Sequence, residues 1–203
     1  MKLKGNILPG YEVYEYFLIV SLPVAIQEEI IGLRKKFHAT FRTIHNIKGR
    51  PSLALAHFIQ YEAVQTKVVD LFKNIAAFSP PLQISLQNFG SFPTHSIFVK
   101  VNEDSGVHKL VKEIRSKAKR NLRVNSETKP MIMLEPHVGI VRKLTPEIYE
   151  QSWSKYCDAV FKAGFRAEEM ILLRRPPGLK SWQVVERFEF QSKSLPATQG
   201  RLF

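Results

Sequence analysis

Two stretches of the sequence repeat the same order of residue types. Residues 51–55 read PSLAL and residues 136–140 read PHVGI: a proline, a position that is serine in one copy and histidine in the other, and then alternating apolar positions. Ser52 and His137 therefore hold corresponding places. Histidine can gain or lose a proton near neutral pH, and serine offers a hydroxyl. If the two stretches face each other, they would form one site for proton transfer or for binding a ligand.

Each stretch opens a predicted strand, and each strand follows another strand and a helix. In the first half, the apolar run 16–23 predicts a strand, and the spacing of apolar residues over 24–41 predicts an amphipathic helix. After the strand that carries Ser52, a second helix is predicted at roughly 63–78. Clean alternation over 82–86 predicts the third strand.

The same order begins again in the second half. A strand precedes a helix at 105–123, for which Ser105 is the predicted N-cap. After the second motif strand, Thr145 is the predicted N-cap of a helix that ends near Gly164. Two further strands are predicted to form a hairpin around residues 176–178.

The repeated order has a period of about 80 residues, which indicates an internal duplication. We expect one bilobal domain over 1–193, with lobes at about 14–92 and 93–191 between which strands can be exchanged. Residues 194–203 show no periodicity and are expected to form a flexible tail.

Composition favours a basic protein with an anionic partner. The chain has 203 residues, 44% of them hydrophobic, which is enough for a packed core. It carries 30 Lys and Arg against 18 Asp and Glu, a net charge of +12. Such an excess favours RNA, nucleotides or other phosphorylated ligands. Basic residues recur along the predicted helix 105–123, as either a phosphate-backbone contact surface or a solvated helix face.

Other chemistry finds no support in the residue pattern. Cys157 is the single cysteine, so no intrachain disulfide is possible, and neither a Cys/His metal spacing nor a Gly-rich phosphate loop occurs. We therefore expect no metal and no cofactor. No apolar run approaches the ~20 residues that cross a bilayer. The short apolar run near the start follows Glu12 and Glu15, and we interpret it as a strand rather than a signal peptide. We expect a cytoplasmic monomer with no membrane partner.

Strands marked P-H-x-T-L at two equivalent places are the signature of the 2H phosphoesterase superfamily, which includes the 2′-5′ RNA ligases and cyclic phosphodiesterases. The chain resembles this superfamily over roughly 14–191, in the motif strands, in YFLIVSLP at 16–23 and in RRPPGLKSWQVVERFEF at 174–190. The resemblance implies a LigT-like α+β fold. In that fold two antiparallel sheets, related by a pseudo-twofold duplication, line a central cleft and helices pack outside.

The resemblance also implies a chemistry. In the superfamily, one histidine acts as general base and the other as general acid on a phosphodiester or 2′,3′-cyclic phosphate, without a metal. The Thr or Ser two residues later binds phosphate oxygens. Residues i and i+2 of a strand lie on the same face, so a proton carrier and a hydroxyl would project into the cleft side by side.

The motifs of this chain depart from that pattern. Ser52 and Ala54 stand at the first His and Thr positions, while His137 keeps the second His position and Gly139 replaces the second Thr. Neither Ala54 nor Gly139 offers a side-chain hydrogen bond. His57 is an alternative first histidine, but it lies an odd number of residues from Ser52, so a regular strand would turn the two to opposite faces. Only a bulge or a changed register would bring His57 to the cleft.

Further candidates for ligand contact lie around the motif strands. Arg142 and His57 occupy matching places, each five residues after the first polar motif position. His45 lies in the loop before the first motif strand, where it can overhang the cleft. Trp182 lies in the late hairpin and can stack a base. Each of these side chains also has an interpretation as an ordinary surface or core residue.

The sequence leaves three functions open. The preferred one is a 2H-like protein that binds RNA or nucleotide phosphodiesters through Ser52, Ala54 and Gly139 in a degenerate site, with activity lost or reduced. The second is an active 2′,3′-cyclic phosphodiesterase or RNA ligase-like enzyme that uses His137 and His57. The third is a non-catalytic protein-interaction scaffold. We prefer the first because the missing groups perform the reaction, and a fold alone does not transfer activity.

Overall fold

The computed structural model describes residues 10–43, 47, 49–125 and 128–194. In chain order the elements are β1 (Val13–Ser21), α1 (Val24–Phe41), β2 (Ser52–Tyr61), the 3₁₀ turn η1 (Glu62–Val64), α2 (Gln65–Phe78), β3 (Leu82–Phe92), β4 (Ser96–Val101), α3 (Val107–Ala118), β5 (Met131–Ile132), β6 (His137–Arg142), α4 (Pro146–Tyr156), β7 (Lys162–Ala167), β8 (Glu169–Arg175) and β9 (Gln183–Glu189).

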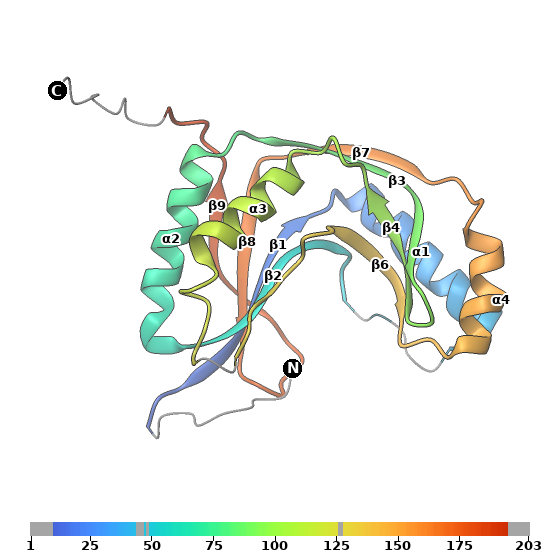
Figure 1. The fold of residues 1–203 in the computed structure, drawn as a ribbon, viewed down its shortest axis with the longest axis horizontal. Helices are drawn as coiled ribbons and strands as arrows, with labels where there is room; N and C mark the ends of the chain where they lie inside the picture. Colours follow the sequence, from blue (N-terminus) through green and yellow to red (C-terminus); the bar gives the residue numbers. More distant parts are fainter. Residues whose placement is uncertain (1–9, 44–46, 48, 126–127, 195–203) are drawn as a thin grey trace.

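The strands form two antiparallel sheets. One has the order β5-β2-β1-β8-β9 and the other β6-β4-β3-β7. Strands β2 and β6, which carry the two motifs, contact each other where the sheets meet. Figure 1 shows the sheets as an arch, with α2 and α3 at one end and α1 and α4 at the other. The expected α+β fold with two antiparallel sheets is confirmed.

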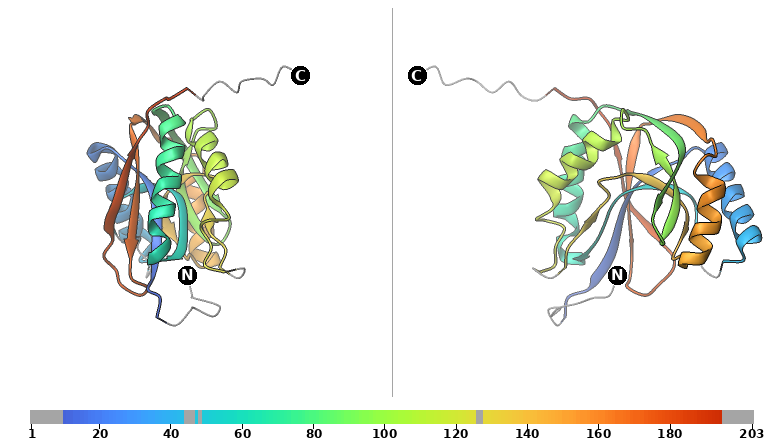
Figure 2. Two further views of the ribbon diagram at one scale, coloured as in Figure 1. Left: turned by 90° about the vertical axis from the view of Figure 1, so that its left-hand side faces the viewer. Right: turned by 45° about the vertical axis from the view of Figure 1, so that its right-hand side comes forward.

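One face of each sheet builds the core. Alternation along β1 buries Tyr16, Leu18 and Val20 completely, and on β4 it buries Ile97 and Val99. These side chains belong to a single hydrophobic cluster that the helices complete. Figure 2 shows α2 with β9 on one side and α3 on the other, in agreement with the contacts between these elements. The opposite face of each sheet is left for the polar motif residues.

The ends of α3 and α4 agree with the sequence-based expectation in part. Thr145 caps α4 as predicted, because its hydroxyl accepts a hydrogen bond from the N–H of Ile148. The predicted cap Ser105 is wrong: Gly106 is the N-cap of α3, and the Ser105 hydroxyl instead accepts from the backbone N–H of Ser85. That bond joins the start of α3 to β3.

The predicted end of α4 near Gly164 is also wrong. Helix α4 ends at Tyr156, and Gly164 lies in β7, opposite Ser85 of β3. The helix 105–123 is likewise shorter than predicted, since α3 ends at Ala118. The predicted late hairpin is present as the antiparallel pair β8 and β9.

Candidate functional site

A bulge in β2 sets which of its side chains share a face. The register against β1 shifts between Leu18 and Ile19, so β2 has one extra residue there, Leu55. On either side of the shift, three β2 residues lie opposite alternate residues of β1. The pairs are Ser52 with Ser21, Ala54 with Ile19, and His57 with Phe17. Directly opposed residues of antiparallel strands project to the same side, so Ser52, Ala54 and His57 share one face. The bulge therefore places His57 on the same face as Ser52, whereas a regular strand would turn it to the opposite face.

Strand β6 repeats this arrangement in the corresponding place. Its register against β4 shifts between Ile97 and Phe98, and the extra residue is Ile140. The pairs are His137 with Lys100, Gly139 with Phe98, and Arg142 with Ser96. Leu55 follows Ser52 by three residues, as Ile140 follows His137, so the duplication extends to the bulge. We call the side of β2 and β6 that carries Ser52, Ala54, His57, His137, Gly139 and Arg142 the motif face.

His137 is held in one orientation on the motif face. Its Nδ1 lies 2.7 Å from the carbonyl oxygen of Glu135, and its ring packs on Phe98 and Phe92 at centroid distances of 4.3 and 5.4 Å. A carbonyl oxygen only accepts hydrogen bonds, so Nδ1 carries the proton and Nε2 of the neutral ring is an acceptor. Burial lowers the pKa of His137, and the Glu135 carbonyl opposes that shift. At neutral pH this histidine is therefore a neutral group whose Nε2 can accept a proton.

Gly139 stands at the second hydroxyl position of the motif, and the side chain of Ile47 occupies the space beside it. A Cβ atom on Gly139 would lie 2.9 Å from Cδ1 of Ile47, a residue that precedes β2 in the chain. A side chain larger than hydrogen at position 139 thus requires Ile47 to move. The motif face of β6 is apolar here and offers no hydroxyl for a phosphate oxygen.

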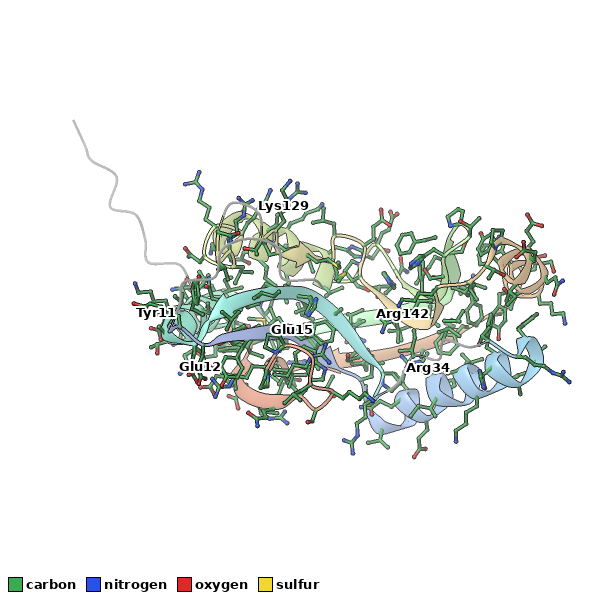
Figure 3. All side chains as sticks on the ribbon, turned by 90° about the horizontal axis from the view of Figure 1, so that it is seen from below. Tyr11, Glu12, Glu15, Arg34, Lys129 and Arg142 are labelled. Carbon is green, nitrogen blue, oxygen red and sulfur yellow. The ribbon has the colours of Figure 1, made fainter. Side chains whose placement is uncertain are left out.

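A buried arginine lies behind Gly139. Arg34 of α1 is 7% exposed, and its guanidinium donates two hydrogen bonds to the carbonyl of Gly139, from Nε at 3.1 Å and Nη2 at 2.9 Å. A third bond runs from Nη1 to the carbonyl of Gly49, just before β2, at 3.1 Å. Burial lowers the pKa of Arg34 to about 10, with a further contribution from the charge of Arg142. Figure 3 shows Arg34 and Arg142 close together.

Sequence reasoning missed Arg34 and Ile47. A signal for Arg34 existed, because a charged residue occupies the buried side of α1 together with Ile26, Ile30 and Phe37. A charge in an apolar helix face indicates a partner that local spacing does not reveal. No local signal identifies Ile47, since its role depends on a strand about 90 residues away in the sequence.

His57 belongs to a separate cluster on the motif face. Its Nε2 lies 4.0 Å from the Glu15 carboxylate, which Arg175 holds through Nε at 2.7 Å and Nη2 at 2.6 Å. The Arg175 guanidinium covers the ring of Trp182 at 4.2 Å, and this ring also packs on Phe17. Burial lowers the pKa of His57, while Glu15 raises it to a smaller extent. Trp182 is thus placed beside His57.

The remaining predicted contacts are placed as follows. Ser52 and Ala54 are half-buried on the motif face. His57 lies five residues along β2 from Ser52, a separation of roughly 15 Å at the rise of an extended strand. His45 lies outside the described residues.

Two other kinds of feature are absent over the described part of the chain. No group of three or more His, Cys, Asp or Glu side chains could hold a metal ion there. None of the helices in the same residues is long and apolar enough to cross a membrane.

Comparison with known proteins identifies the family. The model of the 2′-5′ RNA ligase superfamily matches residues 23–178. The chain belongs to the 2′-5′ RNA ligase superfamily. The motif of the superfamily has two His and two Thr positions. In this chain only one of these four positions, His137, holds the residue type of the motif. A search of curated proteins finds no match.

Solved structures show the same fold. The protein TT0787 of Thermus thermophilus has a TM-score of 0.65 and 18% identity, with 89% of this chain and 100% of that chain covered. Escherichia coli LigT complexed with 3′-AMP gives 0.65 and 18%, covering 88% and 99%. LigT complexed with phosphate gives 0.60 and 18%, covering 88% and 98%. These solved structures are thus similar to this chain over nearly their whole length, at an identity that supports the fold alone.

Proposed function

We propose that this protein binds RNA or nucleotide phosphodiesters at the motif face, and that its ancestral phosphoesterase chemistry is lost or strongly reduced. The observation that carries the proposal is that the proton carriers and hydroxyls expected at the four motif positions are reduced to His137. Ser52 and Ala54 replace one pair, and Gly139, covered by Ile47, leaves the other incomplete.

Cleavage of a phosphodiester needs a base for the attacking group and an acid for the leaving group. His137 is suited to one of these roles, since its Nε2 can accept or return a proton. The serine hydroxyl at position 52 does not carry protons near neutral pH without a base to activate it. A ligand can therefore be bound without the second proton transfer that its cleavage requires.

Binding is supported by charge and by the relatives. LigT has been solved in complex with 3′-AMP, with ATP, with NADP⁺ and with phosphate. This chain keeps a histidine acceptor and adds Arg142 on the same strand face. With a net charge of +12, it has the electrostatic attraction that a phosphorylated ligand needs.

The bulge in β2 favours a second candidate, an active enzyme in which His57 replaces the first motif histidine. His57 lies on the motif face and has a carboxylate behind it. One distance argues against this candidate. His57 lies roughly 15 Å along β2 from Ser52, the first motif position, and this distance exceeds the size of one phosphate group. His57→Gln distinguishes the candidates, because it abolishes turnover only if His57 is catalytic.

The proposal is tested with 2′,3′-cyclic AMP and 2′-5′-linked diadenosine, followed by ³¹P NMR. We expect a saturable shift of the phosphorus signal, which reports binding, and little or no product. Hydrolysis by the wild type that disappears in His137→Ala would establish an active enzyme. Absence of any shift at low salt would instead favour the scaffold function.

A further inference from the structure

The two sheets differ in charge. We call the four-stranded sheet β6-β4-β3-β7 sheet B. Its strands contain no Asp or Glu, and they carry four cationic side chains: Lys100, Arg142, Lys162 and Arg166. The strands of the five-stranded sheet carry three arginines and four glutamates, so their charges nearly cancel. Charge of a single sign attracts a polyanion, and sheet B is therefore the sheet that a polyanion would contact.

The side of sheet B that carries His137 continues to the edge strand β7. Lys100 of β4 is directly opposite His137, and directly opposed residues project to the same side. Two residues after Lys100, the Asn102 side chain donates a hydrogen bond to the Gln87 side chain of β3 at 3.4 Å. Gln87 is in turn opposite Lys162 of β7. One side of the sheet thus links the second motif strand to the edge of sheet B (Figure 1).

This side of sheet B is exposed on β3 and β7. Alternate residues of β3 pack into the core, where α3 contacts the strand, and the residues between them face away from it. The exposed residues are Gln83, Ser85 and Gln87 on β3, and Lys162, Gly164 and Arg166 on β7. Lys100 on β4 is also exposed. We call these seven residues the sheet B surface.

The sheet B surface has a row of small side chains between two rows of long polar ones. The directly opposed pairs are Gln87 with Lys162, Ser85 with Gly164, and Gln83 with Arg166. A Cβ atom on Gly164 would meet one atom within 4 Å, the carbonyl oxygen of Ile84 at 3.7 Å, so the space above this glycine is open. Cations bind phosphates, while amides donate to and accept from base edges and ribose hydroxyls. Single-stranded RNA presents all of these groups.

The cations of this surface are available to a ligand. Lys100 and Lys162 form no ion pair with any carboxylate in the described part of the chain. Arg166 pairs with Glu168 at 2.7 Å, but both side chains are exposed, and such pairs are weak. Lysines on edge strands also discourage pairing with other strands. That role needs no amides beside the lysines and predicts no preference for a longer ligand.

We infer that single-stranded RNA crosses the sheet B surface from the motif face to the edge at β7, so that the ligand is an oligonucleotide rather than a mononucleotide. Three strand spacings of about 4.8 Å separate β6 from β7, which is roughly 14 Å in total. A stacked strand advances about 3.4 Å per nucleotide, so about four nucleotides span this distance. The inference rests on the proposed function for binding at the motif face, and it adds the length of the ligand and the surface that the ligand contacts.

The test compares the Kd values of the RNA dinucleotide ApA and of hexaadenylate by calorimetry. We expect the wild type to bind hexaadenylate at least about tenfold more tightly, as additional charged hydrogen bonds predict. Lys162→Gln with Arg166→Gln should remove most of this advantage. Gly164→Glu, which places a carboxylate in the open row, should do the same. The matched control is Lys35→Gln with Lys36→Gln, an exposed pair on α1, which should keep the advantage.

The outcomes separate this inference from the proposed function. Binding of both ligands with equal affinity would keep the proposed function and overturn the inference. Binding of hexaadenylate alone, lost in the β7 double variant, would keep the sheet B surface and contradict binding at the motif face. Equal losses in the β7 and α1 double variants would overturn the inference, because net charge would then explain the effect. A polyphosphate of equal charge that binds as tightly as hexaadenylate would also overturn it, since the amides would then have no part in binding.

Discussion

At the scale of single residues, the two motif-face histidines predict how stability depends on pH. Burial lowers the pKa of both His137 and His57. In the unfolded chain these groups take up protons near pH 6.5, whereas the folded protein takes them up only at lower pH. The unfolded state therefore binds more protons as the pH falls below about 6.5, and the free energy of unfolding decreases.

Denaturant unfolding between pH 7.5 and pH 5 measures this dependence. We expect the contribution of the two histidines to be fully present above about pH 6.5 and to be lost as the pH falls below it. His137→Asn should reduce the slope of stability against pH. A stability that increases as the pH falls through this range would contradict the assignment of two half-buried neutral imidazoles.

The residues of the candidate site differ in how far the sequence could predict them. Ser52, Ala54, His137 and Gly139 were located by the repeated motif, because equivalent strands keep equivalent spacing. Arg34 was not, since its contact with Gly139 spans 105 positions of the chain. Side chains that reach a site from another element leave only an indirect trace, here a charge on a buried helix face.

At the scale of elements, Gln60 joins the end of β2 to the segment that follows α3. Its side chain is 3% exposed, and its amide donates to the carbonyls of Asn121 at 2.9 Å and Arg123 at 3.0 Å. Gln60→Leu would leave both carbonyls without that donor, so we expect the free energy of unfolding to fall by about 2 kcal/mol.

The matched control is Gln83→Leu, at an exposed position of β3, where the change should stay within about 0.5 kcal/mol. Urea denaturation compares the two variants. A Gln60 variant as stable as the Gln83 variant would show that the segment after α3 is held by other contacts.

Helices and strands were predictable where their patterns are regular, as α1 and β3 show. The bulges were not, because the extra residues Leu55 and Ile140 are apolar residues within apolar strands, and the alternation of apolar residues does not show that one of them is extra. Strand β7 was missed for a related reason. Its sequence KAGFRA has no β-branched residue, and it is held as a strand by pairing with β3.

At the scale of the whole molecule, charge predicts salt-dependent binding of RNA. Helix α3 and the residues after it expose basic side chains on the side opposite the core: Lys109, Lys112, Lys119 and Arg120. The affinity for a short single-stranded RNA should fall steeply as salt rises, with a logarithmic slope that decreases by about 0.7 for each phosphate contact removed.

Fluorescence anisotropy at several salt concentrations measures this slope. We expect Lys112→Glu with Lys119→Glu to reduce it, and Lys35→Glu with Lys36→Glu, an exposed pair on α1, to leave it nearly unchanged. Both double variants have the same net charge. Equal losses would show that the total charge, not the α3 surface, sets the affinity. The composition predicts an anionic partner, and the fold is needed to predict which surface such a partner would contact.

The central claim is that this fold has lost its chemistry because specific side chains are missing from the motif face. The most direct test is the rate of 2′,3′-cyclic AMP hydrolysis by a variant that restores them: Ser52→His, Ala54→Thr and Gly139→Thr, with Ile47→Ala to make room at position 139. General acid–base catalysis contributes roughly a hundredfold or more, so the restored variant should form product at least that much faster than the wild type. Wild-type hydrolysis as fast as that of the restored variant would contradict the account.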